Sequence, residues 1–141
     1  MEQDLIIVTN NKLCSNDLAV VDFVEGDFSR VLMRVRDLVY EGHALISHPI
    51  GASMRMLFSP CRSVLLGQKK HPVNQTHALT IENSIDIYKR STQNRVTDHV
   101  NAVDYARIDM ELLKEAIREH QTIQSGKERG GVLNESGIKK N

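Results

Sequence analysis

The chain has 141 residues, of which 18 are basic and 18 acidic, so its formal net charge is zero. A chain of this length suits one domain. The neutral balance creates no overall field for nucleic acid or an anionic membrane, and the absence of Trp argues against base-stacking platforms. Residues 1–4 are too polar for a secretory signal, and no apolar run approaches the roughly 20 residues of a membrane-spanning helix. We therefore expect a cytoplasmic protein that binds neither nucleic acid nor membranes.

Four short apolar segments predict strands. Leu5–Val8 is a continuous and largely β-branched run, which is typical of a strand buried on both faces of a parallel sheet. Leu18–Val24 is a second run of this kind. Ala44–Ser47 ends before a His-Pro pair, because proline has no donor for a strand ladder, and Ser63–Leu66 supplies the fourth strand.

The clearest predicted helix follows the second strand. Asp27 is a good N-cap, and apolar residues then recur at helical spacing as far as Glu41. Gly42 supplies a left-handed stop without strain at Cβ. Ile50–Pro60 has weak periodicity and predicts a long loop.

The second half of the chain is predicted to be mostly helical. Thr76 is the candidate N-cap of a helix that ends near Asn94. Asp109 is the candidate N-cap of a helix that ends near Gln124. Residues 96–108 are compatible with a loop, a short strand or the start of a helix.

The order of these elements predicts an α/β protein. We expect a three-layer α/β/α sandwich around a small, mostly parallel sheet of about four strands, with a Rossmann-like topology. Residues 1–124 are expected to form this single domain. Residues 125–141 contain four of the eight glycines and few apolar side chains, so we expect them to form a flexible tail.

Polar residues follow the first and third predicted strands. In an open α/β sheet, ligands bind beyond the carboxyl ends of the strands. The hydroxyl, amide, imidazole and guanidinium groups found there suit a small anion. The candidate ligand-binding residues are Thr9, Asn10, Asn11, His48, Gly51, Ser53, Arg55 and Arg62. The alternative interpretation is that the asparagines cap a turn and that the His-Pro pair merely ends a strand.

The sequence contains no recognisable catalytic or cofactor motif. It has neither GxGxxG nor a P-loop, and its six histidines, His71 among them, show no metal-ligand spacing. We therefore expect no cofactor and no metal, and we favour a protein that is not an enzyme. Cys61 lies beside Arg62, whose charge would lower the pKa of the thiol, so thiol redox chemistry through Cys14 and Cys61 stays open as a third hypothesis.

The first half of the chain resembles the small GrdX family. The similarity spans Leu5–Leu66, with a weaker similarity at Asp109–Ile117. Its motifs are Ile6-Ile7-Val8-Thr9-Asn10-Asn11, Phe23-Val24-Glu25-Gly26, Val35-Arg36-Asp37 and Gly42-His43-x-Leu45-x-x-His48-Pro49. The run Met54–Phe58 is more apolar than the family pattern, which suggests that it covers the pocket or meets a partner.

The resemblance implies a cytoplasmic accessory role near the glycine, sarcosine and betaine reductase system, and it supplies no catalytic residue. Components of that reductase system are therefore the expected partners, and homodimerisation is left open. Our leading hypothesis is a non-enzymatic accessory or interaction protein. The alternative is a small-anion or metabolite-binding α/β module, or an enzyme, whose pocket lies at the carboxyl ends of the first and third strands.

Overall fold

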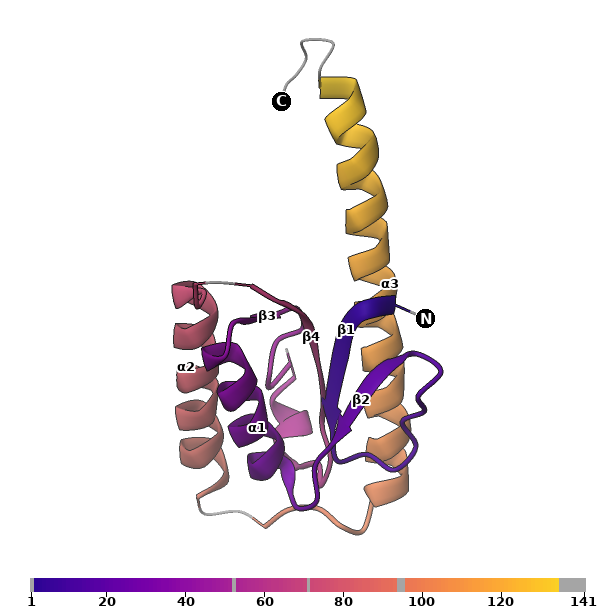
Figure 1. Ribbon diagram of the computed structural model, residues 1–141. Coiled ribbons are helices and arrows are strands. Elements are labelled where there is room, and N and C mark those ends of the chain that lie inside the picture. The colour runs from indigo at the N-terminus through magenta and orange to yellow at the C-terminus, as the bar shows by residue number, and fades with distance from the viewer. Residues whose placement is uncertain (1, 52, 71, 94–95, 135–141) are drawn as a thin grey trace.

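Four strands form one open sheet in the order β2-β1-β4-β3 (Figure 1). The computed structural model describes residues 2–51, 53–70, 72–93 and 96–134. The strands are β1 (Glu2–Thr9), β2 (Ala19–Phe23), β3 (His43–Leu45) and β4 (Ser63–Lys69). β1 pairs with β2 in parallel and with β4 antiparallel, and β3 pairs with β4 antiparallel. The expected α/β class is confirmed.

The expectation of a mostly parallel sheet is wrong, and the Rossmann-like topology inferred from it lacks support. Only the β1–β2 pair is parallel, because β4 lies between β1 and β3 and runs opposite to both. The chain passes from β3 to β4 through the short 3₁₀ helix η1 (Met54–Phe58), without a crossover helix of the kind that joins parallel strands. β1 and β3 still share one direction, so the residues that follow them reach the same edge of the sheet.

Helices α1 (Phe28–Tyr40) and α2 (Gln75–Thr92) cover one face of the sheet. Their apolar side chains share a buried core with alternate residues of β1 and β4, such as Val8 and Leu66. The rings of Phe28 and Tyr88 stack in this core with their centroids 4.7 Å apart. The α1 and α2 helices are thereby joined to each other as well as to the sheet.

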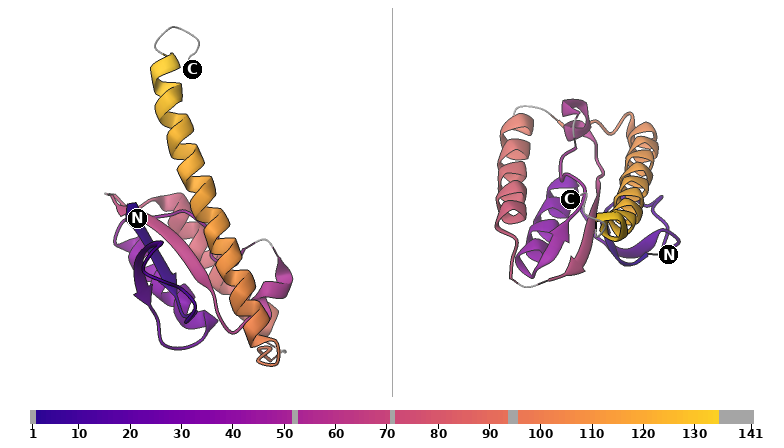
Figure 2. Two further views of the ribbon diagram at one scale, coloured as in Figure 1. Left: turned by 90° about the vertical axis from the view of Figure 1, so that its right-hand side faces the viewer. Right: turned by 90° about the horizontal axis from the view of Figure 1, so that it is seen from above.

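Helix α3 (Ala102–Asn134) covers the opposite face (Figure 2). Met110, Leu113 and Ile117 pack against Leu5 and Ile7 of β1, whose side chains alternate with those in the first core. Both faces of this part of β1 are therefore buried, which explains why Leu5–Val8 is continuously apolar. The second half of α3 extends well beyond the sheet (Figure 1).

The helix boundaries agree with the sequence at α1 and differ elsewhere. Asp27 caps α1, because its Oδ1 accepts a hydrogen bond from the Arg30 backbone amide at 3.1 Å. α2 is capped by Asn74 rather than by Thr76, since the Asn74 side chain accepts from the His77 amide at 3.0 Å. The predicted loop 50–60 contains η1.

The start of α3 corrects the expected role of Asp109. Residues 96–101 form a loop and the helix begins at Ala102, so Asp109 lies inside α3 and is not its N-cap. The helix also continues past the expected end at Gln124 to Asn134. Helical structure therefore covers the first part of the segment predicted as a tail, and residues 135–141 lie outside the described residues.

The outer edge of β3 is closed by a side chain of α2. The backbone amide of Leu45 points away from β4 and donates to Nδ1 of His77 at 3.0 Å. Burial lowers the pKa of His77, which favours the neutral ring that this acceptor role requires. This contact satisfies an edge donor that would otherwise be available to another chain.

Gly42, at the end of α1, is a position where only glycine fits, as the sequence predicted. Its φ of 111° lies in the left-handed region, and an added Cβ would lie 2.3 Å from the carbonyl oxygen of Lys70.

We expect Gly42→Ala to lower the free energy of unfolding by more than about 1 kcal/mol in urea denaturation. The matched control is Gly126→Ala, where an added Cβ meets nothing within 4 Å. This helical substitution should instead stabilise by about 0.5–1 kcal/mol. Equal effects of the two substitutions would contradict the tight approach at Gly42.

Candidate functional site

The polar residues at the carboxyl end of β1 meet the start of β4 and the first third of α3. Thr9 lies opposite Ser63 in the strand register, which brings the loops that flank these residues together. We refer to this set of residues as the sheet-edge cluster. Its members are Thr9, Asn10, Asn11, Arg62, Ser63 and Asp109.

Asp109 is the centre of the sheet-edge cluster and is fully buried. Its Oδ1 accepts the backbone amide of Ser63 at 2.9 Å. Its Oδ2 accepts the Ser63 hydroxyl at 2.6 Å and the Asn11 side-chain amide at 2.9 Å. The Thr9 hydroxyl lies 2.7 Å from that of Ser63. These bonds compensate the burial of a carboxylate, which would be very costly without partners.

Asp109 was not identified as a buried residue from the sequence, although its spacing from the apolar residues of the helix indicates that it is. Asp109 precedes Leu113 by four residues and Ile117 by eight, so it occupies the same helical stripe as two core residues. An acidic residue on a core stripe needs a buried partner. The partner, Ser63, is distant in sequence and only the fold identifies it.

Arg62 turns inward from the start of β4. Its Nε donates to the carbonyl oxygen of Pro49 at 2.8 Å, and its Nη2 donates to the carbonyl of His48. Its Nη1 lies 4.0 Å from Oδ1 of Asp109, and its side chain is only 5% exposed. Burial lowers the pKa of Arg62, and the charge of Asp109 opposes this effect. The guanidinium therefore holds the loop that follows β3.

Both asparagines make bonds within the chain, but only Asn11 caps a turn, as the alternative interpretation proposed for the pair. The side-chain amide of Asn10 donates to the carbonyls of Gly26 and Pro60, and its Oδ1 accepts from the Arg62 amide at 2.8 Å. Asn11 accepts from the Leu13 amide at 3.0 Å, in addition to its bond with Asp109. These side chains join the loops after β1 and β2 to the loop before β4.

The other four candidate ligand-binding residues lie in the loop between β3 and β4. Gly51 is next to Arg62, because an added Cβ would lie 3.5 Å from Nη2 of that side chain. The His48 side chain accepts from the Ile50 amide at 3.3 Å, and its pKa is lowered by burial and by Arg62. Within the described residues, no hydrogen bond or ion pair connects the exposed Ser53 and Arg55 to the sheet-edge cluster. Ala52, in the same segment, lies outside the described residues.

Part of the apolar run Met54–Phe58 in this loop belongs to the core. Leu57 of η1 joins the core formed by α1 and α2, and Met56 is also buried. Met54 is exposed. Packing inside the domain therefore explains the apolar character of Met56 and Leu57, but not that of the exposed Met54.

The pKa values of the two free thiols are raised, contrary to the expectation for Cys61. Burial is the largest cause for both residues, and the negative charge of Asp109 adds to it. The pKa of Cys14 reaches about 11. Arg62 opposes the shift at Cys61, but its influence is smaller than that of burial. Both thiols are therefore held protonated near neutral pH, which makes them weak nucleophiles.

A cleft of about 740 Å³ opens beside the sheet-edge cluster, and we call it the edge cleft. Asn10 and Asn11 form part of its wall, and the loop and first turn of α3 form the opposite wall. Leu13 and Val103 give it exposed apolar sides. Besides the Cys61 thiol, its ionisable lining residues are Lys12, Asp27 and His99, so groups of both signs of charge are present.

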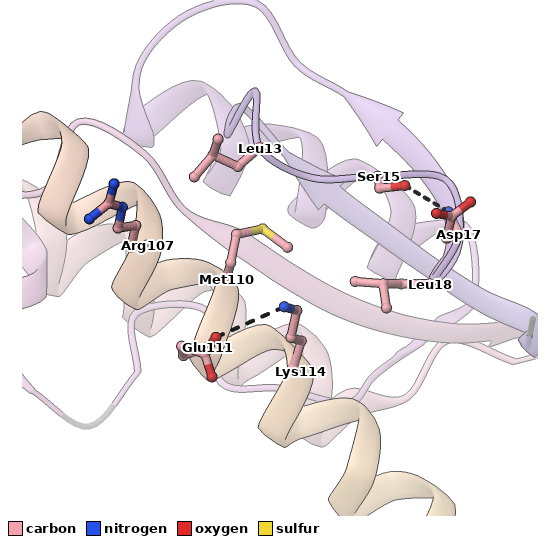
Figure 3. A pocket seen from close by; sticks show the side chains of 8 residues that line it. All are labelled: Leu13, Ser15, Asp17, Leu18, Arg107, Met110, Glu111 and Lys114. Carbon is pink, nitrogen blue, oxygen red and sulfur yellow. Dashed lines mark hydrogen bonds and ion pairs between the residues drawn. The ribbon is translucent and has the colours of Figure 1, made fainter.

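A second cleft, of about 540 Å³, lies between α3 and the loop that joins β1 to β2 (Figure 3). Leu13, Leu18 and Met110 form its apolar part. Its charged residues are balanced, with two basic and two acidic side chains: Arg107, Lys114, Asp17 and Glu111. The Lys114 ammonium and the Glu111 carboxylate lie 3.9 Å apart, as Figure 3 shows.

Two kinds of feature are absent from the part of the chain that the structure describes. No group of three or more His, Cys, Asp and Glu side chains in this part of the chain is placed to hold a metal ion, and His71 lies outside it. None of the helices described combines the length and the apolar character needed to cross a membrane.

The fold and the site together define a small mixed α/β protein whose strand ends are tied to a long helix by buried polar groups. Among known protein families, the model described as GrdX-like protein matches residues 6–118. This match covers most of the chain, so the chain belongs to the GrdX-like family, and the resemblance inferred from its motifs is confirmed. No curated protein and no solved structure matches the chain.

The bonds of Asp109 lead to a stability prediction. We expect Asp109→Ala to lower the free energy of unfolding by about 3 kcal/mol or more, because it leaves the buried charge of Arg62 without its counter-ion and the Ser63 amide without its acceptor. Glu111→Ala, on the exposed side of the same helix, is the matched control and should change stability by less than about 0.5 kcal/mol. Urea denaturation of both variants measures the difference. Similar values would show that the cluster contributes little to the fold.

Proposed function

We propose that this protein is a non-catalytic accessory protein of glycine, sarcosine and betaine reductase metabolism, acting in the cytoplasm by binding components of that system. Membership of the GrdX-like family supports this proposal, since the family resemblance implies this metabolic setting. The accessory role itself rests on the site. A protein of this kind needs a rigid surface that presents contacts to a partner, rather than a group poised for bond making.

The observation that carries the proposal is the internal use of the sheet-edge cluster. Asp109 accepts three hydrogen bonds from within the chain, and Arg62 donates to two backbone carbonyls. Catalytic acids, bases and nucleophiles are instead held within reach of a substrate, with pKa values near the operating pH. The two thiols depart from that requirement, because their pKa values are raised. The internal hydrogen bonds of the cluster and the raised pKa values of the thiols therefore support a structural role rather than a catalytic one.

The proposal is tested by co-purification of tagged protein from an anaerobe growing on glycine. We expect a reductase component to be retained, and we expect the yield to fall in cells grown without glycine, sarcosine or betaine. The same tag on an unrelated protein is the control for non-specific retention. Recovery of no reductase component, under conditions that preserve known complexes, would contradict the accessory role.

A small-molecule binding function is the second candidate, and the edge cleft favours it. The cleft lies beyond the end of β1, and two of the eight candidate ligand-binding residues, Asn10 and Asn11, line it. The candidate residues in the loop after β3, which the predicted pocket also included, are not part of its described lining. Its volume of about 740 Å³ is within the usual range for metabolite sites. In this alternative the protein binds a small anion or metabolite there.

A thermal-shift panel of amino acids, acyl phosphates and nucleotides tests this second candidate. A ligand present at a hundred times its Kd stabilises the folded protein by about 2.7 kcal/mol, which is readily detected. Val103→Trp should abolish the shift by filling the cleft, and the fold should tolerate it because Val103 is 64% exposed. Val100→Trp is the matched control, since Val100 is 94% exposed and is not part of the lining. An undiminished shift in Val103→Trp, or no shift in the wild type, would exclude the edge cleft as the binding site.

A further inference from the structure

A third cleft lies at the opposite end of β4 from the sheet-edge cluster, and we call it the far cleft. It has a volume of about 710 Å³, and its lining residues come mainly from the end of β4, from the segment around β3 and from α3. Figure 1 shows that α3 leaves the sheet at this end. The described lining residues of the far cleft are Leu5, Ala44, Ile46, Gly67, Gln68, Lys70, His120, Gln121, Gln124 and Ser125. Neither the sequence motifs nor the proposed accessory role makes use of it.

The far cleft differs from the other two clefts in its charge. Lys70 and His120 are its ionisable residues among those described, and neither is acidic. The edge cleft and the cleft of Figure 3 both include carboxylates in their linings. A cleft lined by basic groups alone attracts anions and disfavours cations.

The remaining lining residues suit an organic anion better than a simple ion. Three glutamine side chains and the Ser125 hydroxyl supply donors and acceptors around the basic groups. Leu5 and Ile46 provide an apolar floor. Gly67 contributes no side chain, and an added Cβ would approach Ile46 Cδ1 to 3.1 Å, so the floor is closely packed. An apolar floor with a few polar groups around it is the usual composition of a metabolite site.

The strand end that carries Lys70 is held in place by the chain around it. The backbone amide of Lys70 donates to the carbonyl of Gly42 at 2.8 Å. The carbonyl of Gly67 is bonded to Nδ1 of His43 at 2.9 Å. These contacts fix the base of the Lys70 side chain, so less order has to be created when a ligand binds.

We propose that the far cleft binds a small organic oxyanion, either a phosphate ester or a polycarboxylate. Lys70 and His120 are its charged contacts, and the side-chain amides of Gln121 and Gln124 bond its remaining oxygens. A lysine ammonium serves as a point charge for phosphate or carboxylate, without the geometric demands of arginine. Because Gln121 and Gln124 belong to α3, a bound anion connects the end of β4 to the helix at the place where α3 leaves the sheet.

Calorimetric titration of the full chain at fixed ionic strength tests this proposal. Pyrophosphate and citrate are the probes for the two sources of oxyanion, and glycerol is the uncharged control. We expect saturable binding of at least one anion, no binding of glycerol, and a loss of about tenfold in affinity in Lys70→Ala and in His120→Gln. Binding of pyrophosphate alone assigns the cleft to phosphate esters, and binding of citrate alone assigns it to carboxylates.

Lys69→Ala is the matched control, because it removes the same charge from the adjacent position, the last residue of β4. The Lys69 side chain lies beside Gly42 and is not part of the cleft lining, so this variant should keep wild-type affinity. Equal weakening by Lys69→Ala and Lys70→Ala would overturn the proposal, since it would reveal general attraction to a basic surface. The absence of binding by the wild-type protein to either anion would overturn it as well.

Discussion

The buried carboxylate of Asp109 is the contact on which the arrangement of this molecule depends. It connects α3 to the start of β4 through Ser63 and to the loop after β1 through Asn11. A buried carboxylate tolerates few alternative positions, because each displaced hydrogen bond leaves an unsatisfied group. The helix is therefore fixed in register against the sheet, and its apolar residues, such as Leu113, meet their partners on β1 and β4. The same register decides which residues of α3 line each of the three clefts.

The bonds around Asp109 also show which polar residues hold the fold together and which surfaces are left to bind a ligand or a partner. Arg62 and Asn10 have the functional groups expected of an anion site, but their bonds organise the loops at the end of the sheet. The surfaces left for ligands and partners are the clefts along α3 and the half of the helix beyond the sheet. A protein with a rigid end and a long projecting helix suits an accessory role. The basic far cleft adds a place where a metabolite and that helix meet.

The sequence predicted part of the candidate site and could not supply the rest. Thr9, Asn10, Asn11 and Arg62 do come together, because the residues after β1 reach the edge where β4 begins. Their inward orientation was not predictable, since it depends on Asp109, which is distant in sequence and was interpreted as a helix cap. The prediction of a lowered pKa for Cys61 was also wrong. The sequence shows the adjacent arginine, but it does not show the burial that dominates the pKa of the thiol.

Local physical chemistry determined the elements that the sequence alone identified. The apolar runs gave the strands, and Asp27 and Gly42 set the bounds of α1 through a side-chain cap and a left-handed backbone. The motifs along the chain were sufficient to place it in the GrdX-like family. Only the tertiary structure decided the direction of β4, the inward turn of Arg62 and the position of Asp109 within α3. These features depend on contacts between residues far apart in the chain, and short-range propensity carries no information about such pairings.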